Sequence, residues 1–128
     1  MAIKKIVKTP NKVLEKQCQE VTEFGEETKQ LAEDLIDTVK NATDPEGAGL
    51  AAPQIGVSKR MCVVRQFFPN PNDPQEITSK EFILVNPKII SKSDEKYIDI
   101  EGCLSIPDTY GKVERYKNIE VEAQNISG

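Results

Sequence analysis

The sequence predicts an α+β fold of antiparallel sheets with one N-terminal amphipathic helix. A single helical pattern spans residues 26–42, and most of the chain after residue 60 consists of short runs rich in valine, isoleucine and tyrosine. Turn residues separate these runs at intervals typical of hairpins, so an antiparallel sheet is the economical interpretation. The chain has 128 residues, the size of one compact domain, and we expect a single domain over residues 1–128.

The helix is predicted from its apolar spacing. Leu31, Leu35 and Val39 recur every fourth residue and define one apolar face, with acids and lysines on the rest of the surface. Glutamates in the first turn and Lys40 in the last agree with the helix dipole. The helix should end before the proline and glycines of residues 45–49.

Five strands are expected after the helix, over residues 61–65, 82–90, 97–100, 112–115 and 119–124. Pro87 should lie at a sheet edge or on a bulge, because proline cannot donate to a ladder. The proline-rich segment between residues 67 and 80 predicts a long surface excursion. Residues 125–128 have the composition of a hairpin turn.

Charge and cysteine usage exclude several classes. Lysine and arginine number 17 against 21 acids, a net charge of -4, and no basic cluster is present to bind nucleic acid. The N-terminus lacks the apolar core of a secretory signal, so we expect a cytoplasmic chain without a membrane partner. Cys18, Cys62 and Cys103 are widely spaced without a C-x-x-C pair, which argues against a zinc ribbon or a disulfide framework.

The sequence contains no histidine. Its absence excludes Ser-His-Asp and Cys-His nucleophile pairs, histidine-based metal cages and imidazole general bases within these 128 residues. Any chemistry must proceed without imidazole.

The first motif is GAGLAAPQ at residues 47–54. Its small residues let another chain approach the backbone closely, and the amide of Gln54 can donate to a polarised oxygen. On composition alone, the simpler interpretation is a loop of small residues packed on a sheet.

The second motif is EGCLS at residues 101–105. It places the thiol of Cys103 between an acid and backbone amides, where a thiolate could bind a metal. The alternative is a buried cysteine that acts as a small apolar residue, which is the better interpretation for Cys62 within a predicted strand.

Together the two motifs resemble those of the peptide deformylase family, G-x-G-L-A-A-x-Q and E-G-C-L-S. The resemblance implies a peptide-deformylase-like fold and a hydrolase of protein biosynthesis, which removes the N-formyl group from the N-terminal methionine of nascent chains. It also implies a divalent metal, iron or alternatively zinc or nickel. Cys103 then matches the cysteine metal ligand, Gln54 the amide that donates to the formyl oxygen, and the backbone N–H of Leu104 the second donor.

The resemblance also implies how a peptide substrate is held. Ala48, Gly49 and Gly102 match the backbone that receives the N-terminal peptide as an added strand. Glu101 matches a carboxylate that braces the local structure.

The family's third motif, H-E-x-x-H on a helix, has no match in these residues. That motif supplies two metal ligands and the general base. Glu101, Asp99 and Asp108 could lend oxygens instead, but Cys103 shares the face of Glu101 and Asp99 only if the strand stays regular through Gly102. We therefore expect a domain truncated at its C-terminus, without the catalytic helix, and with weak metal binding or none.

Three functions stay open. The chain is an incomplete deformylase that needs a separate H-E-x-x-H segment, a non-catalytic module that binds N-terminal peptides, or a truncated fragment without activity. Without the helix, apolar side chains around Ile98, Ile100 and Leu104 and the edge at residues 119–124 should be exposed, so we expect self-association.

Overall fold

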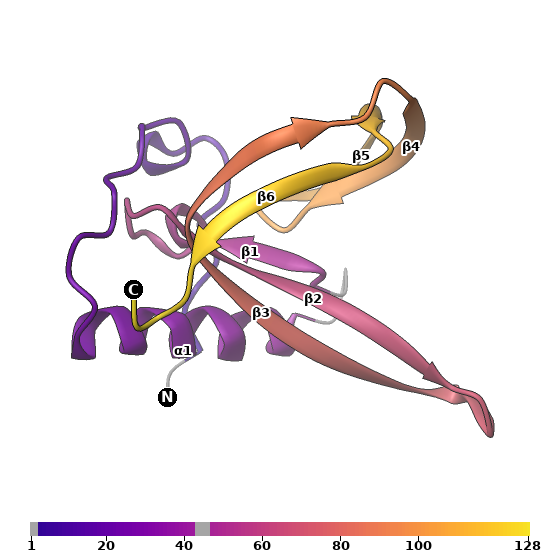
Figure 1. The fold of residues 1–128 in the computed structure, drawn as a ribbon, viewed down its shortest axis with the longest axis horizontal. Coiled ribbons are helices and arrows are strands. Elements are labelled where there is room, and N and C mark those ends of the chain that lie inside the picture. Colours follow the sequence, from indigo (N-terminus) through magenta and orange to yellow (C-terminus); the bar gives the residue numbers. More distant parts are fainter. Residues whose placement is uncertain (1–2, 43–46) are drawn as a thin grey trace.

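The computed structural model describes residues 3–42 and 47–128. A short 3-10 helix precedes the α-helix α1, a second 3-10 helix η2 follows the first strand, and the remaining strands run to the C-terminus (Figure 1). The bounds are Lys12–Leu14, α1 (Glu26–Asn41), β1 (Gly49–Ala51), η2 (Ala52–Ile55), β2 (Met61–Asn70), β3 (Asp73–Lys92), β4 (Lys96–Cys103), β5 (Ile106–Tyr116) and β6 (Ile119–Gln124). The predicted α+β class with antiparallel sheets is confirmed.

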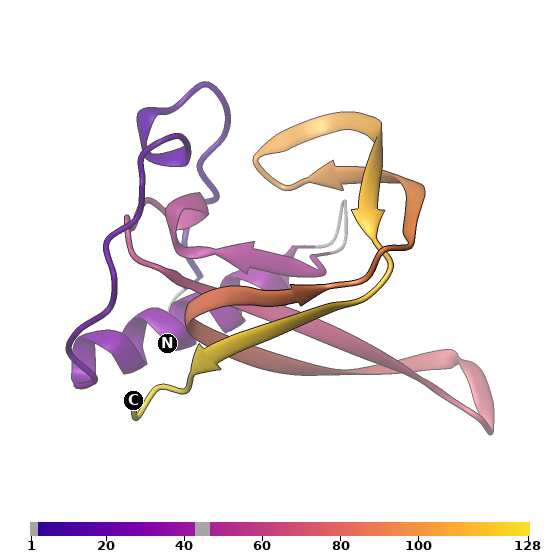
Figure 2. The same ribbon diagram turned by 45° about the horizontal axis from the view of Figure 1, so that its top comes forward.

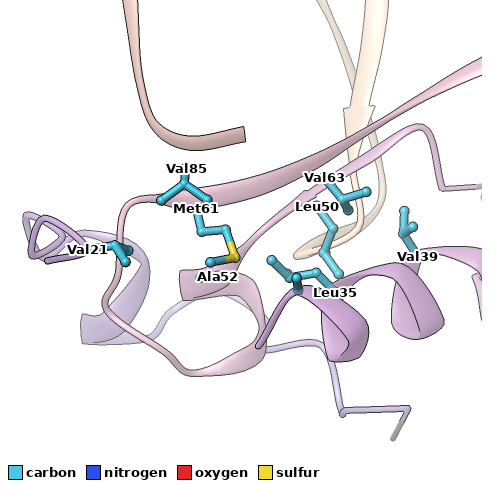
Figure 3. Packing of buried hydrophobic residues seen from close by; sticks show 9 residues of the cluster. Val21, Leu35, Val39, Leu50, Ala52, Met61, Val63 and Val85 are labelled. Atoms are coloured by element: carbon cyan, nitrogen blue, oxygen red, sulfur yellow. The ribbon is translucent and has the colours of Figure 1, made fainter. Parts of the chain in front are cut away.

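The helix packs its apolar face on the larger sheet and forms the core there (Figure 3). Leu35 and Val39 of α1 are fully buried, each contributing about 1.5–3 kcal/mol to folding. They lie beside Leu50 of β1 and Met61 and Val63 of β2. The predicted helix is confirmed and ends one residue early. In the described part of the chain, no helix is long and apolar enough to span a bilayer.

The strands form two antiparallel sheets. The larger has the order β1-β2-β3-β6, and β4 with β5 makes a separate two-stranded hairpin. Within the larger sheet β1 pairs only with β2, so its other side is an edge among the described residues. β6 has the bounds that the sequence predicts.

β2 and β3 continue together as a two-stranded arm that extends away from α1 (Figure 1). The predicted surface excursion between residues 67 and 80 is present, and it consists of paired strands that continue to the tip of this arm, beyond the shorter strands that the sequence predicts. The N–H of Arg65 points toward β1, so alternation turns the nitrogen of Pro69 away from β3 as well. Pro69 therefore costs the β2–β3 ladder no hydrogen bond.

A bulge bends β3 where it meets β6. The register shifts between Val85 and Lys88, so Pro87 lies on a bulge, one of its two predicted positions. Asn86 has φ 50° there, and its side chain hydrogen-bonds both backbone groups of Val21. The bulge thus ties the sheet to the segment before α1.

The β4–β5 hairpin curls above the larger sheet (Figure 2). Ile98 and Ile100 are 66% and 65% exposed, as expected, and every residue of β6 is exposed. Leu104 differs from the expectation, because it is half-buried and packs against the core. The predicted turn after β6 is present, with the Asn125 side chain accepting from the N–H of Ser127.

Candidate functional site

The fold brings the two sequence motifs together. Gln54 lies on η2 and Cys103 at the end of β4, and Gln54 Nε2 is 3.5 Å from Cys103 Sγ. The same nitrogen donates to Ser105 Oγ at 3.2 Å. The amide of Gln54 therefore contacts Cys103 and Ser105, which lie 49 and 51 positions later in the sequence.

The orientation of the Gln54 amide is fixed from its own loop. Its Oε1 accepts the N–H of Ala51 at 2.9 Å, which turns the NH₂ group toward the second motif. The small residues before Gln54 allow this tight turn into η2, which carries Pro53 as its second residue and ends before Gly56 at φ 85°. An amide held this way presents its N–H donors in a set direction.

The N-terminal segment holds both motifs in place. The N–H of Val7 donates to the carbonyl of Gln54 at 2.6 Å, and the N–H of Thr9 donates to the carbonyl of Ser105 at 2.9 Å. Ser105 is only 2% exposed, so its hydroxyl needs the partner that Gln54 supplies. Ser105 stands in the quoted motif, but sequence reasoning gave it no role.

β1 offers an open strand edge beside Gln54. The carbonyl of Ala48 accepts the N–H of Arg65 at 2.9 Å and so faces β2. Because backbone groups alternate in an antiparallel ladder, the N–H and C=O of Gly49 face away from β2. A Cβ at residue 49 would lie 3.3 Å from the carbonyl oxygen of Val63, which favours glycine there. Of the two predicted neighbours, Gly49 supplies the open-edge groups.

Arg65 supports the start of the first motif. Its side chain is 9% exposed and reaches the carbonyl of Gly47 at 2.9 Å, Ser79 Oγ at 3.0 Å and Glu81 Oε2 at 3.3 Å. Hydrogen bonds from Ser79 first, and then from Arg65, hold the pKa of Glu81 below its usual value. Sequence reasoning missed Arg65, because only strand pairing brings it close to Gly47, Ser79 and Glu81. No local sequence pattern indicates these contacts.

Gly102 and Glu101 occupy the other side of the site. A Cβ at Gly102 would lie 2.8 Å from the ring of Tyr110, so the ring would have to shift for any other residue at this position. The Glu101 carboxylate accepts hydrogen bonds from Nε and Nη2 of Arg115, and the one from Nη2 is 2.6 Å long. These hydrogen bonds lower the pKa of Glu101 and raise that of Arg115. The carboxylate is thereby engaged by an arginine to which sequence reasoning gave no role.

Comparisons with known proteins assign the chain to a family. The family model described as polypeptide deformylase matches residues 3–128. The chain belongs to the polypeptide deformylase family. A peptide deformylase of Acidobacterium capsulatum is 42% identical over 128 residues, which are all of this chain and 69% of that protein. One from Heliobacterium modesticaldum is 41% identical, again over the whole chain and 75% of that protein.

Solved deformylase structures have the same fold. A class I type b peptide deformylase from Acinetobacter baumannii, crystallised with Met-Ala-Ser bound, superposes with a TM-score of 0.82 at 30% identity. The match covers 99% of this chain and 79% of that one. The Thermotoga maritima enzyme gives a TM-score of 0.80 at 32% identity, covering 98% of this chain and 76% of that one.

The family uses a divalent metal, and the described residues offer one ligand for it. Cys103 is exposed, but the register shifts between Gly102 and Cys103, so the condition for sharing a face with Glu101 and Asp99 is not met. Residues 3–42 and 47–128 hold no group of three histidine, cysteine or acidic side chains that could bind a metal. The side chain of Asp108 lies outside the described residues. A catalytic zinc site needs three protein ligands, so these residues do not fit one alone.

Proposed function

We propose that these 128 residues form the part of a deformylase site that receives a formylated N-terminal peptide. The observation that carries the proposal is the Gln54 amide, which stands 3.5 Å from the Cys103 thiol. An amide donor beside a thiol and an open strand edge suits a short peptide that ends in a carbonyl group.

The peptide would add to β1 as a further strand. Gly49 supplies the N–H and C=O that pair with an extended chain, and Ala48 and Gly102 keep the neighbouring backbone free of bulk. The Met-Ala-Ser bound to the Acinetobacter baumannii deformylase supports a short methionyl peptide as the ligand class. For a ligand made on ribosomes, we expect action in the cytoplasm.

The formyl oxygen would lie between two donors. Gln54 Nε2 carries two hydrogens and can turn one from Ser105 or Cys103 to a carbonyl oxygen, while the backbone N–H of Leu104 provides the second donor. Glu101, held by Arg115, braces the loop that presents Leu104. This arrangement binds and polarises the carbonyl without moving a proton.

Hydrolysis needs more than this chain supplies. The sequence has no histidine, and Glu101 is occupied by Arg115, so the described part of the site offers the carbonyl no general base. We therefore propose that the 128-residue chain binds formyl-methionyl peptides without cleaving them.

Binding and turnover of formyl-Met-Ala-Ser test the proposal. We expect saturable binding by calorimetry that Gln54→Leu weakens and that Cys62→Ser, on the neighbouring strand, leaves unchanged. No formate should be released when ferrous, nickel or zinc ion is added. Formate release that disappears in Cys103→Ala would contradict the binding-only function, and absence of binding would contradict the proposed ligand.

A second candidate is a deformylase completed by a separate H-E-x-x-H segment. The exposed Cys103 thiol, aligned by Gln54, favours it as one member of a ligand set. The intact mass of the protein from its natural source, together with anything that co-purifies stoichiometrically, distinguishes this candidate from the binding module.

A further inference from the structure

The outer edge of β3 is open along the arm. β6 pairs with β3 only from Val85 onward, while β2 covers the opposite side of β3. Residues 77–84 therefore expose one row of backbone groups among the described residues. An exposed strand edge of this length is a template for pairing with another chain.

Two hydrogen bonds establish which groups face this edge. The N–H of Arg65 donates to Ala48, so Val64 and the other even-numbered residues of β2 face β3. The N–H of Asn86 donates to the carbonyl of Arg60, which fits the same pattern from the β3 side. Odd-numbered residues of β3 between 77 and 83 therefore direct their N–H and C=O groups outward.

The charges along this edge are complementary to themselves. An antiparallel pairing of two copies centred on Thr78 places Glu76 opposite Lys80 of the second copy, and does so twice. Centring on Glu76 or Lys80 would instead oppose like charges. Centring on Ile77 or Ser79 would leave both charges without an opposite partner. One register is therefore favoured.

Exposed apolar side chains of the arm would gain from the same pairing. Val64 and Phe82 are direct cross-strand partners on one face, and Phe68 lies further along it. All three are exposed, and Ile77 on the other face is 60% exposed. Two arms joined by their edges would make a four-stranded ribbon on which these side chains gain neighbours.

We propose that a second copy of this chain docks along the β3 edge, with Thr78 on the two-fold axis. The arm stands clear of the rest of the molecule in both views (Figures 1 and 2). In the antiparallel pair, the rest of each molecule begins at residue 85, which is seven residue steps or roughly 24 Å from the axis. It therefore lies beyond the tip of the other copy's arm. The two bodies then do not collide.

The other strand edges are less suited to a second copy. β6 carries two glutamates and no cation over residues 119–124. β5 could oppose Lys112 with Glu114 of a second copy, but its hairpin is strongly curved (Figure 2). β1 has only three residues and adjoins the proposed peptide site.

Charge reversal tests the register. In sedimentation over about a hundredfold concentration range, the unmodified chain should show a monomer–dimer equilibrium. Lys80→Glu and Glu76→Lys should each raise the dimer dissociation constant about tenfold, and the double reversal should restore it. Lys112→Glu and the pair Ile98→Ser, Ile100→Ser are matched controls that should leave it unchanged.

A disulfide tests the axis. Thr78→Cys should form an intermolecular disulfide under mild oxidation, because directly opposed residues of a non-hydrogen-bonded pair lie close enough, whereas Lys80→Cys should not. Peptide mapping excludes links through the native cysteines. A strictly monomeric chain, a dimer insensitive to charge reversal, or one that dissociates only in the Ile98 and Ile100 variant would overturn the proposal.

Discussion

Gln54 Nε2 lies 3.5 Å from Cys103 Sγ, although 49 positions separate the two residues in the sequence. The contact depends on both ends of the amide, because Oε1 accepts from Ala51 while Nε2 reaches the thiol and Ser105. One side chain thus links loop geometry to ligand binding, and substitutions can separate the two roles.

Gln54→Leu and Gln54→Glu should differ in their effects. Leucine removes the acceptor for the Ala51 N–H, so the free energy of unfolding should fall by about 1–2 kcal/mol and peptide affinity should fall too. Glutamate keeps that acceptor but loses the donor, so affinity should fall about tenfold with stability nearly unchanged. Urea denaturation and calorimetry on both variants measure this. A Gln54→Glu protein with unaltered affinity would show that the amide does not contact the ligand.

Arg65→Met should destabilise the chain by about 2–3 kcal/mol. The substitution leaves the half-buried Glu81 without its arginine and the carbonyl of Gly47 without its donor. Amide exchange at Leu50 should accelerate, since β1 loses its support.

Two related variants control for the Arg65 effect. Arg65→Lys keeps the positive charge but not the planar guanidinium group. Its free energy of unfolding should therefore lie between those of the unmodified chain and Arg65→Met. Adding Glu81→Gln to Arg65→Met should recover part of the loss, because the half-buried carboxylate then no longer carries a charge without its arginine. Equal stability of Arg65→Met and the unmodified chain would exclude the supporting role.

The sequence predicted those helices and strands that are determined by the periodicity of neighbouring side chains. The helix and β6 follow from side-chain periodicity, and both motifs were located from residue identity. β1 was missed because Gly49–Ala51 has poor strand propensity and becomes a strand only by pairing with β2 and burying Leu50. The strands of the arm beyond residue 65 were missed because prolines signal loops, whereas the nitrogen of Pro69 faces away from β3, toward an edge that pairs with no strand among the described residues.

The supporting contacts of the site could not be predicted for the same reason. Arg65 reaches Gly47 across 18 positions, and Arg115 reaches Glu101 across 14. Strand register places Arg65 beside Ala48 and opposite Glu81, whereas Arg115 lies opposite Tyr97 and reaches Glu101 along the β4–β5 hairpin. Both contacts depend on strand pairing, which is a property of the whole sheet. Residue types at the site follow from the motifs, while their support follows from the fold.

Acid should destabilise the chain partly through Glu81. Its folded-state pKa is held below the ordinary value of 4.5, mainly by the hydrogen bond from Ser79, so the ionised carboxylate stabilises the fold. That contribution is present above the unfolded pKa and is lost as pH falls through the folded pKa. Unfolding free energy measured below pH 4.5 should therefore decline less steeply in Glu81→Gln. Ser79→Ala should raise the folded-state pKa of Glu81 and so narrow the pH range over which this stabilisation is lost. An unchanged slope of unfolding free energy against pH in both variants would contradict this linkage.

Thiol reactivity and metal content should both depend on Cys103. Its side chain is exposed, whereas burial raises the pKa of the Cys62 thiol and so lowers its reactive thiolate fraction. A fast phase in Ellman's reaction should therefore vanish in Cys103→Ser and persist in Cys62→Ser. Zinc should slow that phase by binding the same sulfur, yet metal analysis after dialysis should find well under one equivalent, because a lone thiolate holds zinc weakly. A full equivalent that survives dialysis and is lost in Cys103→Ser would mean that other side chains move to complete a site around this sulfur.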